Sequence, residues 1–223
     1  MKILAIDTAT AACSAALMGD GAILASAHVA MLRGHAEALL PMVERVMAEA
    51  GVAYGALDLI AATVGPGAFT GLRVGLAAAR GLALAGGLPI IGVTTLEALA
   101  HGAAEARGGG RSVMAVLNAR RDEVYYQSFD AALAPLGPPR IGAALEVEPP
   151  EGPILLVGDG AALIPAALDG RRSDVEILPS LLPDAAVVAA IAAGRFDPAA
   201  PPESPPEPLY LRGSGAQAPA ALS

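Results

Sequence analysis

Strand-like and helix-like segments follow the same order twice along the chain, and this repeat restricts the fold more than any other feature. Residues 2–29 predict an apolar strand and a β-hairpin, and residues 111–130 predict a second hairpin. Helical and strand-like patterns alternate after each of these segments. Such an order predicts an α/β protein of two related subdomains, over residues 1–108 and 109–196, with Gly108–Gly110 at the boundary.

The segments between these landmarks have the periodicity of helices and strands. Helices are expected at 35–50, 70–85, 95–106 and 184–194, and strands at 57–64, 88–93 and 174–178. Residues 153–161 predict a strand that runs into a helix. Residues 197–223 are rich in proline, so we expect a tail without a fold of its own, docked in part around Tyr210.

Composition limits the partners that the chain can bind unaided. The 223 residues carry a net charge of −8, and only 3% of them are aromatic. Proteins that hold nucleic acid alone usually present a basic stripe or a stacking platform, so we expect a partner to hold any RNA. The single cysteine, Cys13, and the lack of a membrane-spanning apolar stretch indicate a cytoplasmic protein.

Several groups that common catalytic sites require are scarce. Lys2 is the only lysine and opens the chain, so it cannot complete a Walker-type phosphate loop. His28, His35 and His101 are not spaced as metal ligands, and no Gly-x-Ser-x-Gly motif surrounds a serine. The sequence therefore favours a non-catalytic role.

The stretch VGPGAFTGLRVG lies between a strand-like and a helical segment. If Thr70 is the N-cap of the helix, the loop at Gly65 and Gly67 presents free backbone N–H groups to an anion. The alternative is a tight strand-to-helix turn in which Gly71 and Gly75 let another helix approach closely. The residues alone leave both interpretations open.

Five stretches together resemble one family. They are MKILAIDTATAACSAAL, GHAEALLPMVERVM, the glycine-rich stretch continued to residue 99, NARRDEVYY and PEPLYLR. They resemble the TsaB (YeaZ) family of bacterial tRNA threonylcarbamoyladenosine biosynthesis proteins. The resemblance runs through most of residues 1–126 and returns at 210–212. It implies an actin-like ATPase fold, of the sugar kinase and actin type, built from two ribonuclease-H-like subdomains with a cleft between them.

The resemblance also implies a function. Proteins of this pathway add a threonylcarbamoyl group to the adenosine next to the anticodon of tRNA. TsaC makes the activated threonylcarbamoyl adenylate, the paralogue TsaD carries the metal and the transfer chemistry, and TsaE is an ATPase. This chain is then expected to be a non-catalytic subunit that binds and activates a TsaD-like partner, works with a TsaE-like ATPase and self-associates to a homodimer.

Two positions depart from catalytic relatives. TsaD-like proteins hold their metal with two helical histidines four residues apart, whereas here His35 is followed by Leu39. Actin-like ATPases carry Asp-x-Gly in their first phosphate hairpin, whereas here Asp7 is followed by Ala9. We therefore expect no metal and no catalytic residue, and ATP or ADP binding that is weak or absent. The candidate nucleotide or anion residues are Asp7, Thr8, Thr10, Gly65, Gly67 and Thr70.

Asp7 itself has two interpretations: it orients a water or Mg²⁺, or it caps a neighbouring turn, and we favour the second. The resemblance further implies that two helices pair with a second TsaB or with TsaD. The expected interface residues are Leu39, Val43, Met47, Leu72, Gly75, Leu76 and Ala79. The alternative is that both apolar stripes cover a sheet, as part of each must.

Two other functions are compatible with the expected fold. One is a nucleotide-dependent enzyme, such as a small-molecule kinase or a nucleotide hydrolase, and the other is a glycoprotease-like peptidase. A separate cluster of Arg120, Arg121 and Glu123 either is solvated or faces a partner or RNA.

Overall fold

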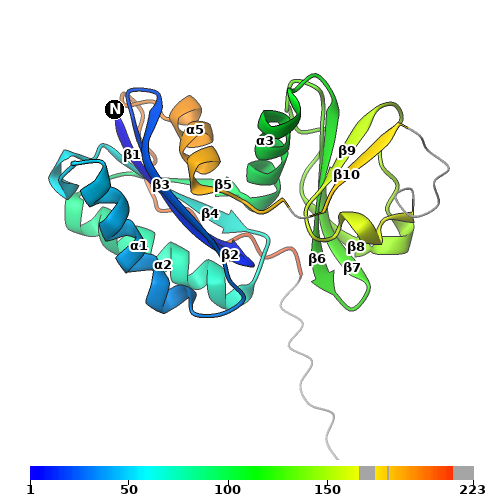
Figure 1. Ribbon diagram of the computed structural model, residues 1–223, viewed down its shortest axis with the longest axis horizontal. Coiled ribbons are helices and arrows are strands. Elements are labelled where there is room, and N and C mark those ends of the chain that lie inside the picture. The colour runs from blue at the N-terminus through cyan, green and yellow to red at the C-terminus, as the bar shows by residue number, and fades with distance from the viewer. Residues whose placement is uncertain (166–173, 180, 213–223) are drawn as a thin grey trace, which may run out of the picture.

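The computed structural model describes residues 1–165, 174–179 and 181–212. Within these residues two five-stranded sheets lie next to each other, and helices pack on them (Figure 1). The strands are β1 (Lys2–Thr10), β2 (Ala12–Gly19), β3 (Ala22–Ala30), β4 (Leu59–Gly65), β5 (Ile90–Thr94), β6 (Ser112–Arg120), β7 (Glu123–Phe129), β8 (Arg140–Ala143), β9 (Ile154–Val157) and β10 (Val175–Leu178). The α-helices are α1 (His35–Glu49), α2 (Phe69–Gly86), α3 (Thr95–Arg107) and α5 (Ala185–Arg195), and the 3-10 turns are η1 (Tyr54–Ala56), η2 (Ala144–Glu146) and η3 (Ala161–Leu163).

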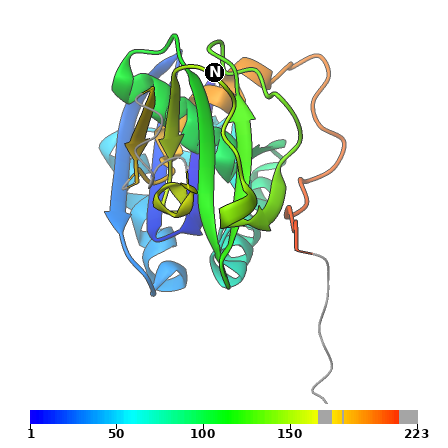
Figure 2. The ribbon, with the colours of Figure 1, turned by 90° about the vertical axis from the view of Figure 1, so that its right-hand side faces the viewer.

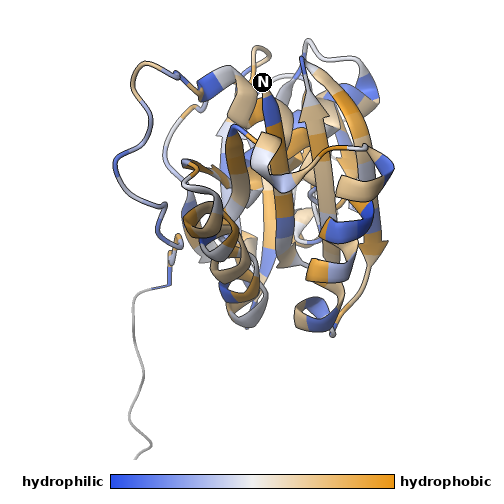
Figure 3. Cartoon of the chain, turned by 90° about the vertical axis from the view of Figure 1, so that its left-hand side faces the viewer, coloured by the Kyte–Doolittle hydropathy of each residue, from blue (hydrophilic) through white to orange (hydrophobic). Residues whose placement is uncertain are grey.

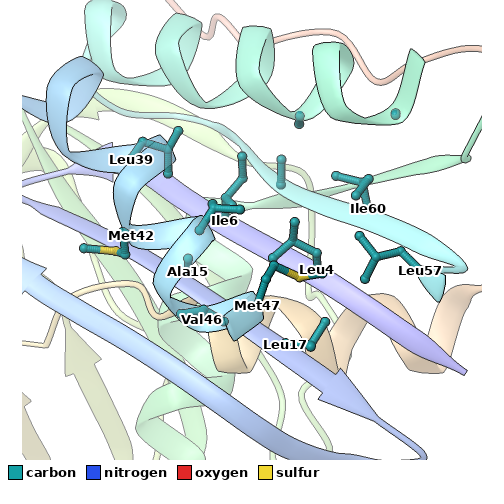
Figure 4. Close-up of a cluster of buried hydrophobic side chains, with 14 of the residues drawn as sticks. Leu4, Ile6, Ala15, Leu17, Leu39, Met42, Val46, Met47, Leu57 and Ile60 are labelled. Carbon is teal, nitrogen blue, oxygen red and sulfur yellow. The ribbon is translucent and has the colours of Figure 1, made fainter. Parts of the chain in front are cut away.

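The first sheet has the strand order β3-β2-β1-β4-β5. Short turns join β1, β2 and β3, which pair antiparallel, whereas helices connect the parallel strands β1, β4 and β5. On one face α1 packs on β2 and β3, and α2 packs on β1 and β4. Their apolar stripes close a core that includes Leu4, Ile6, Leu39 and Val46 (Figure 4).

The second sheet has the order β10-β9-β6-β7-β8 (Figure 2). The helix α3 lies between the two sheets, because it packs on β6 of the second sheet and on β4 and β5 of the first. Its Leu96 and Leu99 join Val113 and Leu155 in one buried cluster. The short strand β8 was not predicted. Where a helix was expected after β9, the structure has the 3-10 turn η3, which ends at the extended residue Ile164, and residues 166–173 lie outside the described part.

The helix α5 comes from the predicted second subdomain but packs on the first sheet. It contacts β1, β2, β4 and β5 on the face opposite α1 and α2. Its Val188 and Ala192 are fully buried against Ile3 and Val93. The sheet requires this helix because its second face is apolar and would otherwise be exposed to water. The predicted second subdomain, residues 109–196, therefore includes a helix that covers the sheet of the first.

The tail then crosses back along the first sheet. The amide of Leu209 donates to the carbonyl oxygen of Val64 at 2.7 Å, and its side chain packs against the core beneath α1 and α2. Pro206 packs on Gly92 of β5. These residues pack along β4 and β5, next to α2, on the face that α1 and α2 cover.

Hydropathy follows this arrangement, with apolar residues gathered on the strands and the inner sides of the helices (Figure 3). In the described part of the chain, no helix combines the length and apolar character needed to cross a membrane.

Candidate functional site

A cavity of about 910 Å³ opens between the two halves of the chain. The β1–β2 turn and the first turns of α1 and α2 form one wall, and the end of β6 with Asp159 forms the other. Its lining includes Thr10, Arg33, His35, Glu37, Gly67, Phe69, Thr70, Asn118, Arg120, Tyr125 and Asp159. This position, between two α/β halves, is where the family resemblance implies a cleft.

The glycines of the loop let α2 approach the end of β1. A Cβ on Gly67 would lie 2.2 Å from the carbonyl oxygen of Ala9, and one on Gly71 would lie 2.1 Å from that of Thr8. A Cβ on Gly75 would lie 2.4 Å from the hydroxyl of Thr8. The close approach is therefore to a strand, and not to another helix as one of the two interpretations of the sequence had it.

Hydrogen bonds hold the loop in this position. The amide of Ala68 donates to Ala9 O at 2.7 Å, and the hydroxyl of Thr8 donates to Gly71 O at 2.7 Å. Gly65 has φ of +110°, which only glycine adopts easily. The amide of Ala68, which a phosphate-binding loop would use to bind an anion, is thus already bound to Ala9.

Thr70 does not cap α2. The N-cap is Ala68, which has no side chain able to accept a hydrogen bond, and Thr70 lies exposed in the first turn. The N-cap of α1, Gly34, also lacks a side-chain cap. First-turn N–H groups of a helix have no partner inside it, so both helices present positive dipole ends at the cavity. Glu37 in the first turn of α1 offsets part of that charge.

Asp7 is fully buried and does not line the cavity. Its Oδ1 accepts hydrogen bonds from the hydroxyl of Thr63 at 2.6 Å and from the amide of Ala9 at 3.1 Å, and no partner is found for its Oδ2. Burial raises the pKa of Asp7 to about 7, more than the bonds from Thr63 and Ala9 lower it. The carboxyl group therefore joins the end of β1 to Thr63 of β4, and it is buried away from the cavity.

The six candidate nucleotide or anion residues therefore separate into two groups. Thr10, Gly67 and Thr70 line the cavity, whereas Asp7, Thr8 and Gly65 do not.

His35 lies at the start of α1 and its Nε2 is 3.1 Å from the carbonyl oxygen of Thr10. Leu39, one turn later, is 1% exposed in the core. Among the residues that the structure describes, no three His, Cys, Asp or Glu side chains form a cluster able to hold a metal ion.

The predicted interface residues are corrected by their burial. All of them face the first sheet: Leu39, Val43, Met47, Leu72, Gly75, Leu76 and Ala79. The stripes with the strongest apolar periodicity form the core, because a helix on a sheet buries its most apolar face. The outer faces of α1 and α2 carry other apolar side chains, Leu40 at 50% and Leu84 at 86% exposure.

Sequence reasoning expected the tail to dock around Tyr210 but did not identify the residues that it contacts near the cavity. Tyr210 of the tail lies with its ring centroid 5.8 Å from that of Phe69, and Arg73 lies over the Phe69 ring. Arg212 pairs with Glu123 of β7, which belongs to the predicted charge cluster. No periodic signal marks such contacts, since they join residues far apart in sequence.

Comparison with known proteins identifies relatives of this chain. The family of the tRNA N6-adenosine threonylcarbamoyltransferase TsaD matches residues 29–137. The tRNA threonylcarbamoyladenosine biosynthesis protein TsaB of Escherichia coli is 45% identical over 130 residues, which are 58% of this chain and 55% of that protein. The chain thus spans about half the length of this curated relative.

Solved structures agree over a longer stretch. The structure of YeaZ from Pseudomonas aeruginosa superimposes with a TM-score of 0.77 and 35% identity, over 87% of this chain and 92% of that one. Component A of the (R)-2-hydroxyglutaryl-CoA dehydratase of Acidaminococcus fermentans has a TM-score of 0.52 at 12% identity, covering 87% and 98% of the two chains. The second likeness concerns the fold alone, and it confirms the predicted actin-like ATPase architecture. From its likeness to TsaB and to YeaZ, the chain belongs to the TsaB (YeaZ) family.

Proposed function

We propose that this chain is a non-catalytic subunit in tRNA threonylcarbamoyladenosine synthesis, which binds and activates a TsaD-like partner in the cytoplasm. One observation carries the proposal: Leu39, a core residue, stands where a metal-binding helix needs its second histidine. The names of the relatives indicate the pathway. The buried carboxyl group of Asp7 supports the proposal that this chain has no catalytic activity of its own.

Activation by docking requires only a difference in binding free energy. A TsaD-like partner that exists in competent and incompetent arrangements shifts toward the competent one if this chain binds that arrangement more tightly. The outer faces of α1 and α2 suit such docking, because exposed Leu40 and Leu84 add apolar area without belonging to the core. A homodimer through the same faces and a TsaE-like ATPase in the assembly are part of the proposal.

The cavity is proposed to bind ATP or ADP weakly or not at all in the isolated chain. The cradle amide of Ala68 is already bound to Ala9, and Asp7 is closed off from the cavity. Calorimetry with ATP and Mg²⁺ tests this point. A dissociation constant near micromolar that is lost on Thr70→Ala would contradict it.

Reconstitution tests the function directly. The purified chain is combined with a TsaD-like protein, a TsaE-like protein, ATP, tRNA and a source of threonylcarbamoyl adenylate, and the modified nucleoside is measured by mass spectrometry. We expect product only in the complete mixture, and none from this chain alone. Full product without this chain would remove the proposal, and product from this chain alone would make it an enzyme.

A further inference from the structure

Residues 206–212, called the strap below, touch both walls of the cavity mouth. On the wall formed by the first half, the Leu209 amide donates to Val64 O, and the Arg80 guanidinium donates to Pro206 O at 2.8 Å. The carbonyl oxygen of Leu209 lies so close to Gly65 that a Cβ there would approach it to 3.0 Å. The strap is thus fixed to the segment that leads into the cavity loop.

Tyr210 adds a second attachment to the same wall. Its ring packs beside Phe69, the residue that follows the N-cap of α2 and lines the cavity. The Nε of Arg73 donates to the Tyr210 hydroxyl at 3.3 Å, while the guanidinium lies 3.6 Å from the centre of the Phe69 ring. At this distance the guanidinium is attracted to the face of the ring.

Arg212 reaches the opposite wall. Its guanidinium donates to Ala119 O of β6 at 3.1 Å and pairs with the carboxylate of Glu123 on β7. Ala119 and Arg120 also line the cavity from that side. The seven residues of the strap therefore join the wall formed by the first half of the chain to the wall formed by the end of β6.

The two halves also meet at α3, through its buried contacts with both sheets. Figure 1 shows α3 between the halves at the top of the view, while the tail reaches the second half near the bottom. Packing at α3 is apolar, whereas the strap reaches the second half through the polar contacts of Arg212. In this arrangement α3 can act as a hinge between the halves, and the strap connects them on the other side.

We propose that the strap is a latch: it holds the walls of the cavity at a fixed separation, and release of Arg212 lets them part about α3. The side chains of Arg212 and Glu123 are 42% and 39% exposed. Ion pairs with this exposure contribute little to stability, so the latch opens without unfolding the chain. The proposal goes beyond the function in tRNA modification and does not depend on it.

Paired spin labels test the latch in the full chain. Glu44→Cys on α1 and Glu146→Cys in η2 place one label on each half, at exposed positions. Burial raises the pKa of the Cys13 thiol to about 11, so the native cysteine does not compete for label at neutral pH. Pulsed electron paramagnetic resonance then gives the distribution of distances between the halves.

We expect one narrow distance distribution in the otherwise unaltered chain. Arg212→Gln and, separately, Glu123→Gln should each broaden it at least twofold and add a longer distance, and the double variant should match the single ones. Exchange of the Leu209 amide with solvent should quicken at least fivefold in the same variants. The control is Arg140→Gln, which removes an exposed arginine of β8 outside the strap contacts.

An unchanged distribution in either Arg212→Gln or Glu123→Gln overturns the proposal, as does equal broadening in the Arg140→Gln control. Circular dichroism of each variant is measured first. Both altered side chains lie on the surface, so we expect the fold to be retained.

Discussion

Gly67, Gly71 and Gly75 bring the start of α2 against the end of β1, where no side chain fits. This explains the glycine-rich loop without any ligand. We predict that Gly71→Ala lowers the free energy of unfolding by about 3 kcal/mol, because its Cβ would press on the Thr8 carbonyl. Gly81→Ala, in the same helix with no atom within 4 Å of its Cβ, should raise stability by about 0.5–1 kcal/mol. Urea denaturation compares the two, and equal effects would show that Gly71 is not confined by β1.

A second residue-scale prediction concerns Asp7, whose pKa is raised from 3.8 to about 7 by burial. The folded chain binds this proton more tightly than the unfolded chain does. The stability that the fold gains from protonated Asp7 is therefore fully present below about pH 4, and it is lost as the pH rises through about 7. Asp7→Asn keeps an acceptor for Thr63 and removes the charge, so it should raise the free energy of unfolding by about 2 kcal/mol at pH 8 and little at pH 4.

Urea titrations at pH 4, 6 and 8 measure this difference, with Glu148→Gln as the control at an exposed carboxylate. A loss of stability in Asp7→Asn that is the same at each pH would contradict the prediction. Such a result would mean that the fold requires the carboxyl group of Asp7 for its contacts, whether or not the group is charged.

At the scale of single elements, α1 and α2 each have a buried face and an outer face with different roles. Val43 is 1% exposed, so we predict that Val43→Glu abolishes cooperative unfolding in circular dichroism. Leu40→Glu and Leu84→Glu alter only the outer faces, and should retain the fold while weakening association with a TsaD-like partner at least tenfold. Titration calorimetry measures that affinity. Unaltered affinity in both would exclude the outer helix faces as the docking surface.

The elements also show what sequence patterns can and cannot predict. Helical spacing of apolar residues located α1 and α2 closely, since periodicity is a local property of the chain. The same spacing misled the choice of interface residues, because the most apolar stripe marks burial and not partner contact. β8 was missed because four residues with partial burial carry little pattern. The contacts of Tyr210 and Arg212 depend on long-range folding, which no local pattern records.

At the scale of the whole molecule, the first sheet depends on both ends of the sequence. Residues 1–108 lack α5, which buries Ile3, Ile91 and Val93 on the second face. We predict that a fragment of residues 1–108 shows no cooperative thermal transition and binds a hydrophobic dye, because that face is bare. Adding a fragment of residues 109–212 should restore a transition. A cooperative transition of the first fragment alone would show that the two halves fold independently.

The return of α5 to the first sheet also sets an order of events during synthesis. The strands of that sheet leave the ribosome early, but the helix that covers their second face is made some 90 residues after β5 ends at Thr94. At a translation rate of about 5–20 residues per second, the second face of the sheet stays exposed for roughly 5–20 s before α5 is made. During that interval the nascent chain exposes an apolar sheet surface that a chaperone can bind, and its folding is completed only when the second half has been translated.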